Sequence, residues 1–169
     1  YDIDRNKKLQ DKLHDLEARG WQIGLHGSYA SADDFEILKD EKERLESSLG
    51  LELNKTRQHW LNYSELVTPY SHAKLFDSDS TIGWNDRMGY RAGCASMYHP
   101  YDHKNKKAFD FWEVPQVIMD ANIYDYGSSN RDELIAVGLD IIKTVCQLKN
   151  GHIAISWHPR TCSSDYNWH

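Results

Sequence analysis

Residues 21–57 read WQIGLHGSYASADDFEILKDEKERLESSLGLELNKTR, and this stretch decides the fold class. The apolar run 21–26 predicts a short buried strand that ends in the polar residue His26. Residues 32–49 carry apolar side chains at helical spacing and are followed by a glycine, which is a typical helix stop. Residues 51–57 then predict a second strand. A strand, a helix and a strand in this order favour two neighbouring parallel strands.

The same alternation extends in both directions along the chain. Amphipathic or apolar patterns predict helices at 5–19 and 131–148 and strands at 111–114, 116–120 and 152–158, with shorter strands possible at 80–84 and 88–91. No repeat, low-complexity tract or linker rich in proline and glycine divides the sequence. We therefore predict one α/β domain over residues 1–169, with a mainly parallel sheet that is open or closed into a barrel.

Composition excludes several classes of function. The chain has 169 residues, 40% of them hydrophobic, which is typical of a globular protein. Its 26 acidic and 20 basic residues give a net charge of −6, so it lacks the basic face that nucleic-acid binding needs. No apolar run approaches the roughly 18 residues of a membrane span. We expect neither nucleic acid nor a membrane span to be part of its function.

The cysteines indicate a compartment. Cys94, Cys146 and Cys162 are odd in number and none forms a C-x-x-C pair, so a disulfide framework or a thiolate zinc site is not expected. A reducing cytoplasm is the predicted location. Cys146 lies in an apolar run and is predicted to be part of the core.

Polar residues follow four of the predicted strands at the point where each strand ends. They are His26, Arg57, Asp120 and His158. Because ligands of parallel α/β folds bind at the carboxyl ends of the strands, we expect these residues to contribute to one site. Two histidines with a carboxylate nearby are typical of a divalent-metal site, and zinc with an open coordination position would hold a hydrolytic water.

Each candidate also has a structural interpretation. A lone histidine such as His26 is often a hydrogen-bonded core residue, and Arg57 could form a structural ion pair. Trp60 and Trp157 could stack on sugar rings or pack in the core, and the sequence favours neither. Ser28, two residues after His26, could support a metal ligand or bind an oxygen of a small anion.

Taken in order, these segments resemble the polysaccharide deacetylases. Residues 23–29, IGLHGSY, look like the motif in which a metal-binding histidine is followed by Ser or Thr. Residues 56–61, TRQHWL, are similar to the segment with the family's arginine. Residues 88–93, MGYRAG, resemble a segment of one bacterial branch found near cell-surface polysaccharide genes, and 115–120 and 155–158 match that branch's later strands.

The resemblance implies a distorted (β/α) barrel of the NodB-like type, carbohydrate esterase family 4, in a bacterial protein. It implies a metal-dependent hydrolase that removes N-acetyl or O-acetyl groups from a carbohydrate or a cell-surface polysaccharide precursor, with a divalent metal, commonly zinc. In this assignment His26 binds the metal and Ser28 supports the metal site. Arg57 orients the catalytic base, and His158 is the general acid. The predicted contacts to the sugar are Trp157, Arg91 and Trp60.

Three features depart from the family pattern. The position four residues after His26, where the family has a second histidine, is Ala30, so we expect His59 to be the replacement metal ligand. The family's first strand carries adjacent aspartates, and no apolar run precedes Arg5 to form it, so the barrel is expected to be incomplete at the amino end. The family's acidic motif before the final histidine is not evident, which leaves Asp120 a supporting role.

Two other functions stay open at this point. A catalytically silent carbohydrate-binding relative would keep the fold and lose the aspartates. A barrel glycosidase would need two carboxylates at strand ends, and Glu113 with Asp120 is the approximate pair that the sequence offers.

Overall fold

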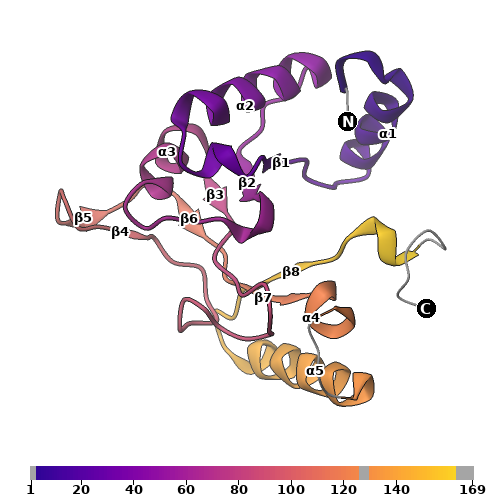
Figure 1. Ribbon diagram of the computed structural model, residues 1–169, viewed down its shortest axis with the longest axis vertical. Helices are drawn as coiled ribbons and strands as arrows, with labels where there is room; N and C mark the ends of the chain where they lie inside the picture. Colours follow the sequence, from indigo (N-terminus) through magenta and orange to yellow (C-terminus); the bar gives the residue numbers. More distant parts are fainter. Residues whose placement is uncertain (1–2, 126–129, 163–169) are drawn as a thin grey trace. The chain divides into compact units, whose positions relative to one another are not determined.

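The computed structural model describes residues 3–125 and 130–162, and Figure 1 shows their arrangement along the chain. The chain divides into two compact units. The first contains Tyr1–Asp79 and His99–Trp112, and the second contains Ser80–Tyr98 and Glu113–His169. Each unit is described by itself below, and the single domain over residues 1–169 stays a prediction.

A parallel sheet forms the centre of the first unit. Strand β1 (Leu25–Gly27) pairs with β2 (Lys55–Gln58), which pairs with β3 (Ser78–Asp79), both in parallel. The strand order is β1-β2-β3-β6, and β6 (Trp112–Glu113) joins at Trp112, whose N–H donates to Asp77 O at 2.8 Å. This sheet confirms the predicted strand–helix–strand order and its parallel direction.

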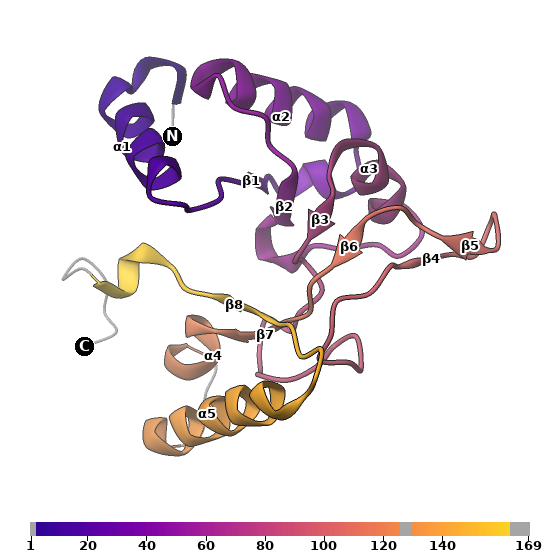
Figure 2. The same cartoon turned by 180° about the vertical axis from the view of Figure 1, so that it is seen from behind.

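The helix between β1 and β2 ends where it was predicted to end, but it begins at Phe35, three residues after the predicted start, because residues 30–32 form a separate 3-10 helix. Helix α2 spans Phe35–Leu49, and the Asp34 carboxylate caps it by accepting the N–H groups of Glu36 and Ile37. Gly50 ends it with a φ of 64°, a left-handed conformation that glycine adopts without steric cost. Both views of the molecule place α2 along β1 and β2 (Figures 1 and 2).

A small apolar core holds α2 against the sheet. Its buried members are Leu25 of β1, Leu38 of α2 and Phe76, which follows α3. The other elements of this unit are η1 (Ile3–Arg5), α1 (Lys7–Ala18), η2 (Ala30–Ala32), η3 (His59–Leu61), α3 (Thr68–Leu75) and the antiparallel strands β4 (Tyr101–Asp102) and β5 (Lys107–Ala108).

The second unit is built on another parallel pair. Strand β7 (Gln116–Met119) pairs with β8 (Ala154–Ser156), with an irregularity between Gln116 and Ile118. All four β7 residues are buried. Short helices α4 (Asp120–Tyr124) and η4 (Pro159–Cys162) follow these strands, and the long helix α5 (Arg131–Gln147) connects them. The Asn130 side chain caps α5 by accepting the N–H of Asp132.

Several local predictions were wrong. Residues 21–24 are not a strand, and Trp21 is 64% exposed, because no neighbouring strand pairs with them. Residues 80–84 and 88–91 form no regular strand. On α5, Cys146 is exposed and not part of the core, because the buried side of the helix contains Gly138 and Val145. Apolar residues on a helix therefore did not all face the core.

The sheets bear on the barrel prediction. The strands of the described residues form one four-stranded sheet and two pairs, mostly parallel, and no closed barrel is formed among them. The mixed α/β class with a mainly parallel sheet is confirmed, and barrel closure stays a prediction. Within residues 3–125 and 130–162, no helix has the length and apolar character needed to cross a membrane.

Candidate functional site

The first group of predicted site residues lies on β1, β2 and the turn that follows β2. In the parallel register His26 is the Cα partner of Arg57. Both strands alternate between buried and more exposed positions, and His26 and Arg57 share the outer side while Leu25, Thr56 and Gln58 are buried. The predicted strand-end residues of this unit are therefore brought together.

His59 joins this group, although it is 33 residues from His26. The Nε2 atom of His26 lies 3.2 Å from Nδ1 of His59, and the two rings meet edge to face with centroids 5.3 Å apart. Both side chains are exposed to solvent. The structure thus places the two histidines that the sequence nominated as metal ligands side by side.

The distance between the two nitrogens can be compared with zinc geometry. Two imidazole nitrogens bound at about 2.0–2.1 Å to one tetrahedral zinc lie about 3.3 Å apart. The observed 3.2 Å fits that arrangement, and it equally suits a hydrogen bond between the rings in the absence of metal. Imidazole is also a donor type that zinc prefers. Among the described residues, however, no group of three or more His, Cys, Asp and Glu gathers as a metal site.

The turn after β2 has an unusual backbone. Trp60 and Leu61 have φ values of 58° and 50°, a left-handed conformation that non-glycine residues adopt at a cost of about 1–3 kcal/mol each. Trp60 is 59% exposed, and its ring meets the His59 ring edge to face. Strained backbone of this kind persists where surrounding contacts hold it, so the position of His59 is set by tertiary structure.

The loop after β1 is tied down by a residue that the sequence reasoning missed. The backbone N–H of Ser28 donates to Glu41 Oε2 at 3.0 Å, and the Ser28 Oγ atom accepts from Ser31 N at 3.4 Å. Glu41 lies on α2. No local sequence signal identifies it, because the contact depends on the loop folding back over α2.

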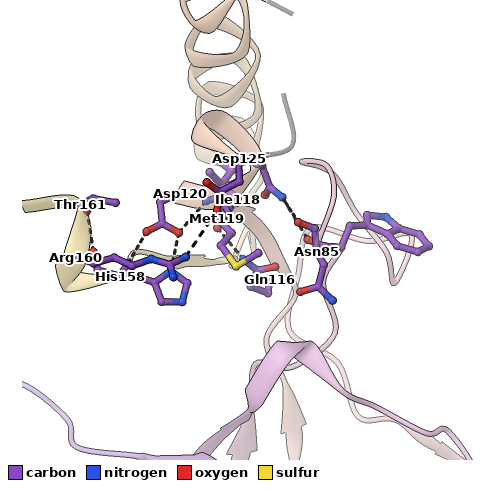
Figure 3. A network of polar contacts seen from close by, with 12 residues as sticks. Asn85, Gln116, Ile118, Met119, Asp120, Asp125, His158, Arg160 and Thr161 are labelled. Carbon is purple, nitrogen blue, oxygen red and sulfur yellow. Dashed lines mark hydrogen bonds and ion pairs between the residues drawn. The ribbon is translucent and has the colours of Figure 1, made fainter. Parts of the chain in front are cut away.

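The second group lies in the other unit, at the carboxyl ends of β7 and β8. The Asp120 carboxylate is fully buried and lies beside the His158 ring, as Figure 3 shows. Its Oδ1 atom lies 2.7 Å from His158 Nδ1 and also accepts the N–H of Ala121 at 2.8 Å. Its Oδ2 atom accepts the backbone N–H of His158 at 2.8 Å.

This pair has a chemical consequence for His158. An ionised carboxylate only accepts hydrogen bonds, so it favours the proton on Nδ1 and leaves Nε2, on the opposite side of the ring, as the reactive nitrogen. The His158 side chain is 38% exposed, so a substrate can reach it. The sequence placed Asp120 at a strand end together with His158, although the comparison with the family motifs left it only a supporting role; the structure shows that it contacts the His158 ring directly.

The remaining predicted residues are partly engaged in structural contacts. Arg91 Nη1 donates to Gly83 O at 3.2 Å, and its guanidinium carbon lies 5.5 Å from the centre of the Trp84 ring. Trp157 is 49% exposed and lies near Tyr124, with ring centroids 6.3 Å apart. The sugar-binding roles of Arg91, Trp157 and Trp60 stay predictions.

The two carboxylates considered for a glycosidase are both enclosed by protein. Glu113 and Asp120 are fully buried. Glu113 Oε1 accepts the N–H of Ile82 at 2.9 Å, and Asp120 is held by His158 and Ala121. Carboxylates that flank a glycosidic bond need access to a sugar, so these contacts do not favour that function.

Comparison with solved structures gives a match over most of the chain. A crystal structure of a candidate polysaccharide deacetylase from Mycobacterium smegmatis aligns with 93% of this chain, with a TM-score of 0.63 and 18% sequence identity. The chain shares its fold with that protein. A candidate polysaccharide deacetylase involved in O-antigen biosynthesis in Bordetella bronchiseptica aligns with 89% of the chain, with a TM-score of 0.47 and 18% identity.

The match covers only part of those proteins. The chain spans 56% of the Mycobacterium smegmatis protein and 65% of the Bordetella bronchiseptica protein. No protein-family model matches the sequence, and no curated protein matches it. The comparison therefore establishes a deacetylase-like α/β fold for this chain.

Proposed function

We propose that this chain is part of a metal-dependent hydrolase that removes acetyl groups from a carbohydrate. The observation that carries the proposal is the His26–His59 pair, whose nitrogens lie 3.2 Å apart on the outer side of a parallel sheet. Fold likeness to a candidate polysaccharide deacetylase supports the substrate class. The resemblance of residues 23–29 and 56–61 to the motifs of that family supports it independently.

In this proposal His26 and His59 hold a divalent metal, and zinc is the ion that paired imidazoles favour. When bound, the metal supplies Lewis-acid polarisation of the acetyl carbonyl and lowers the pKa of water. Hydrolytic zinc sites have three protein ligands, so the proposal requires one ligand besides this pair. The family resemblance assigns that ligand to an aspartate. Ser28 supports the loop that follows His26, and Arg57 orients the base.

His158 is the proposed general acid for the departing amine. Asp120 holds Nδ1, so a proton on Nε2 of the imidazolium is the one available for donation to the leaving nitrogen. The buried carboxylate also stabilises the positive charge on that ring, as the aspartate of a catalytic triad does. Trp60, Trp157 and Arg91 are proposed as contacts to the sugar.

The test combines metal binding with acetate release. We expect Zn²⁺ and Co²⁺ titrations of the protein to show saturable binding that is weakened at least tenfold in His26→Ala and His59→Ala. His103→Ala is the matched control, because His103 is an exposed histidine of the same unit. Acetate release from N-acetylglucosamine oligomers should fall in parallel in the first two variants alone.

Three results distinguish the alternatives. Metal binding that is unchanged in His59→Ala would remove His59 from the site. Binding of chito-oligosaccharides without metal and without acetate release would favour the catalytically silent relative. A protein that binds no metal and releases no acetate would overturn the proposed function.

A further inference from the structure

A buried chain of polar side chains lies beneath the His26–His59 pair, all within the first unit. It consists of Ser31, Gln58, His72 and Asp79, each fully buried or nearly so. Burying polar groups in this number is costly unless each has a partner. None of the four residues was nominated from the sequence, and the proposed chemistry does not use them directly.

Gln58 is the centre of this chain. Its Oε1 atom accepts from Ser31 Oγ at 3.0 Å, and its Nε2 atom lies 2.9 Å from His72 Nε2. On the far side of the His72 ring, Nδ1 lies 3.1 Å from Asp79 Oδ2. The contact with Asp79 is electrostatic and does not have the alignment of a good hydrogen bond.

The Asp79 carboxylate determines which atoms donate and which accept in this series of buried side chains. A carboxylate favours the His72 tautomer with its proton on Nδ1, which leaves Nε2 to accept a hydrogen bond. The amide of Gln58 then donates to that Nε2 atom, and its carbonyl oxygen is left to accept from the Ser31 hydroxyl. The Gln58 side chain can therefore take only one of its two amide orientations.

This buried chain of polar side chains joins the segment after β1, the strand that holds His26, to the end of β2, which His59 follows directly. Gln58 is the last residue of β2 and immediately precedes His59, and it is the register partner of Gly27, which immediately follows His26. Ser31 belongs to the loop after β1 and also donates to Ser28 O at 2.9 Å. Gly27 leaves no spare room, since a Cβ there would collide with Gln58 Oε1 and Ser31 Oγ.

We infer that Gln58, oriented by His72 and Asp79, is the positioning residue that sets the spacing between His26 and His59. The inference rests on the proposed function for its catalytic meaning. Its structural part does not depend on that function. The buried Gln58 amide fixes the start of the strained turn at Trp60 and Leu61, and this turn sets the position of the His59 ring beside His26. Partners that orient metal ligands typically change metal affinity by about 10–100-fold when they are removed.

The test replaces Gln58 with residues of similar size. Gln58→Met removes the hydrogen bonds to Ser31 and His72 and keeps the volume, and Gln58→Glu keeps the shape and the oxygen that accepts from Ser31 but loses the donor to His72. Gln116→Met is the matched control, because Gln116 is also a buried strand glutamine with one internal hydrogen bond, to Ile118 O at 2.8 Å, and lies in the other unit. We expect Gln58→Met to weaken Zn²⁺ binding about 10–100-fold, Gln58→Glu to weaken it less, and Gln116→Met to leave it within about twofold.

A second readout needs no metal. The imidazole NMR signals of His26 and His59 in the metal-free protein should shift or broaden in Gln58→Met and stay in place in Gln116→Met. If Gln58→Met fails to fold, Ser31→Ala, which removes one link of the chain, should give the same changes at smaller size. Unchanged histidine signals in a folded Gln58→Met or Ser31→Ala protein would overturn the inference. Histidine signals that move in a protein that binds no Zn²⁺ would leave the positioning role standing and overturn the proposed function alone.

Discussion

At the scale of single residues, the contact between Asp120 and His158 is the one with the clearest chemical meaning. Asp120 directly follows a buried strand, and its two oxygens accept from His158 and Ala121 without exposure to water. The same carboxylate fixes the loop after β8 through the His158 backbone and orients its ring. Asp120, which the family motifs left with a supporting role, therefore also orients His158.

A substitution of Asp120 tests that orienting role. In Asp120→Asn the amide can no longer hold the Nδ1–H tautomer of His158, so we expect acetate release to fall about 10²–10⁴-fold in kcat/KM, the range supplied by general acid–base groups. Zn²⁺ affinity should stay close to wild type.

Asp125→Asn is the matched control for this prediction. Asp125 directly follows α4, the short helix that begins at Asp120, and its contact with Arg160 is long, at 3.9 Å. We expect it to keep wild-type activity. A fall of less than threefold in kcat/KM for acetate release in Asp120→Asn would contradict the orienting role of Asp120 toward His158.

At the scale of elements, the β4–β5 hairpin shows how a turn can be held by one carboxylate. Asp102 accepts hydrogen bonds from Lys104 N, Asn105 N, Asn105 Nδ2 and Tyr70 Oη, at 2.7–3.0 Å. Burial by itself would raise the pKa of the Asp102 carboxyl, but these hydrogen bonds outweigh it and lower that pKa to about 2 from 3.8. The hydrogen bonds therefore favour the ionised form in the folded protein.

The lowered pKa predicts a dependence of stability on acid. Because the folded pKa lies below the unfolded value, the ionised Asp102 stabilises the fold fully above about pH 4, and this contribution is lost as the pH falls toward about 2. We expect the free energy of unfolding of the wild type, measured by urea titration, to decline across that window. In Asp102→Asn the decline should be smaller. Equal declines in both proteins would contradict the prediction.

Helix ends were the elements that local sequence predicted best. The start of α5 at Arg131 and the stop of α2 at Gly50 have the expected places, because caps and stops depend on residues within one turn of the helix. Strands were predicted less well. Residues 152–158 were expected as one strand, but only Ala154–Ser156 pairs, and Ile155 is exposed. Pairing and burial of a strand depend on neighbours far away in the sequence.

At the scale of the whole molecule, a bound metal should stabilise the fold. A ligand that binds only the folded protein raises its stability by about 2.7 kcal/mol at a concentration of 100 times its Kd. For a chain of this size, that corresponds to a rise of about 5–11 °C in the unfolding midpoint. We expect Zn²⁺ to raise the wild-type midpoint in calorimetry.

The same variants serve as controls for this measurement. His59→Ala should lose most of the rise, and His103→Ala should keep it. A rise of equal size in all three proteins would place the stabilising ion somewhere other than the His26–His59 pair.

The sequence by itself determined the α/β class, the order of the main helices and strands and the residue types near the strand ends. These features follow from apolar periodicity and from capping residues, which act over a few residues. It also nominated His26, His59 and His158 through their places in motifs.

Only the tertiary structure decided which of those groups meet and what holds them. The contact of His26 with His59 and the pairing of Asp120 with His158 join residues 33 and 38 positions apart, and the buried polar side chains from Ser31 to Asp79 link residues from three separate elements. Such contacts depend on strand register and on loops folding back over helices. Both are fixed by packing and burial across the fold, which no local pattern encodes.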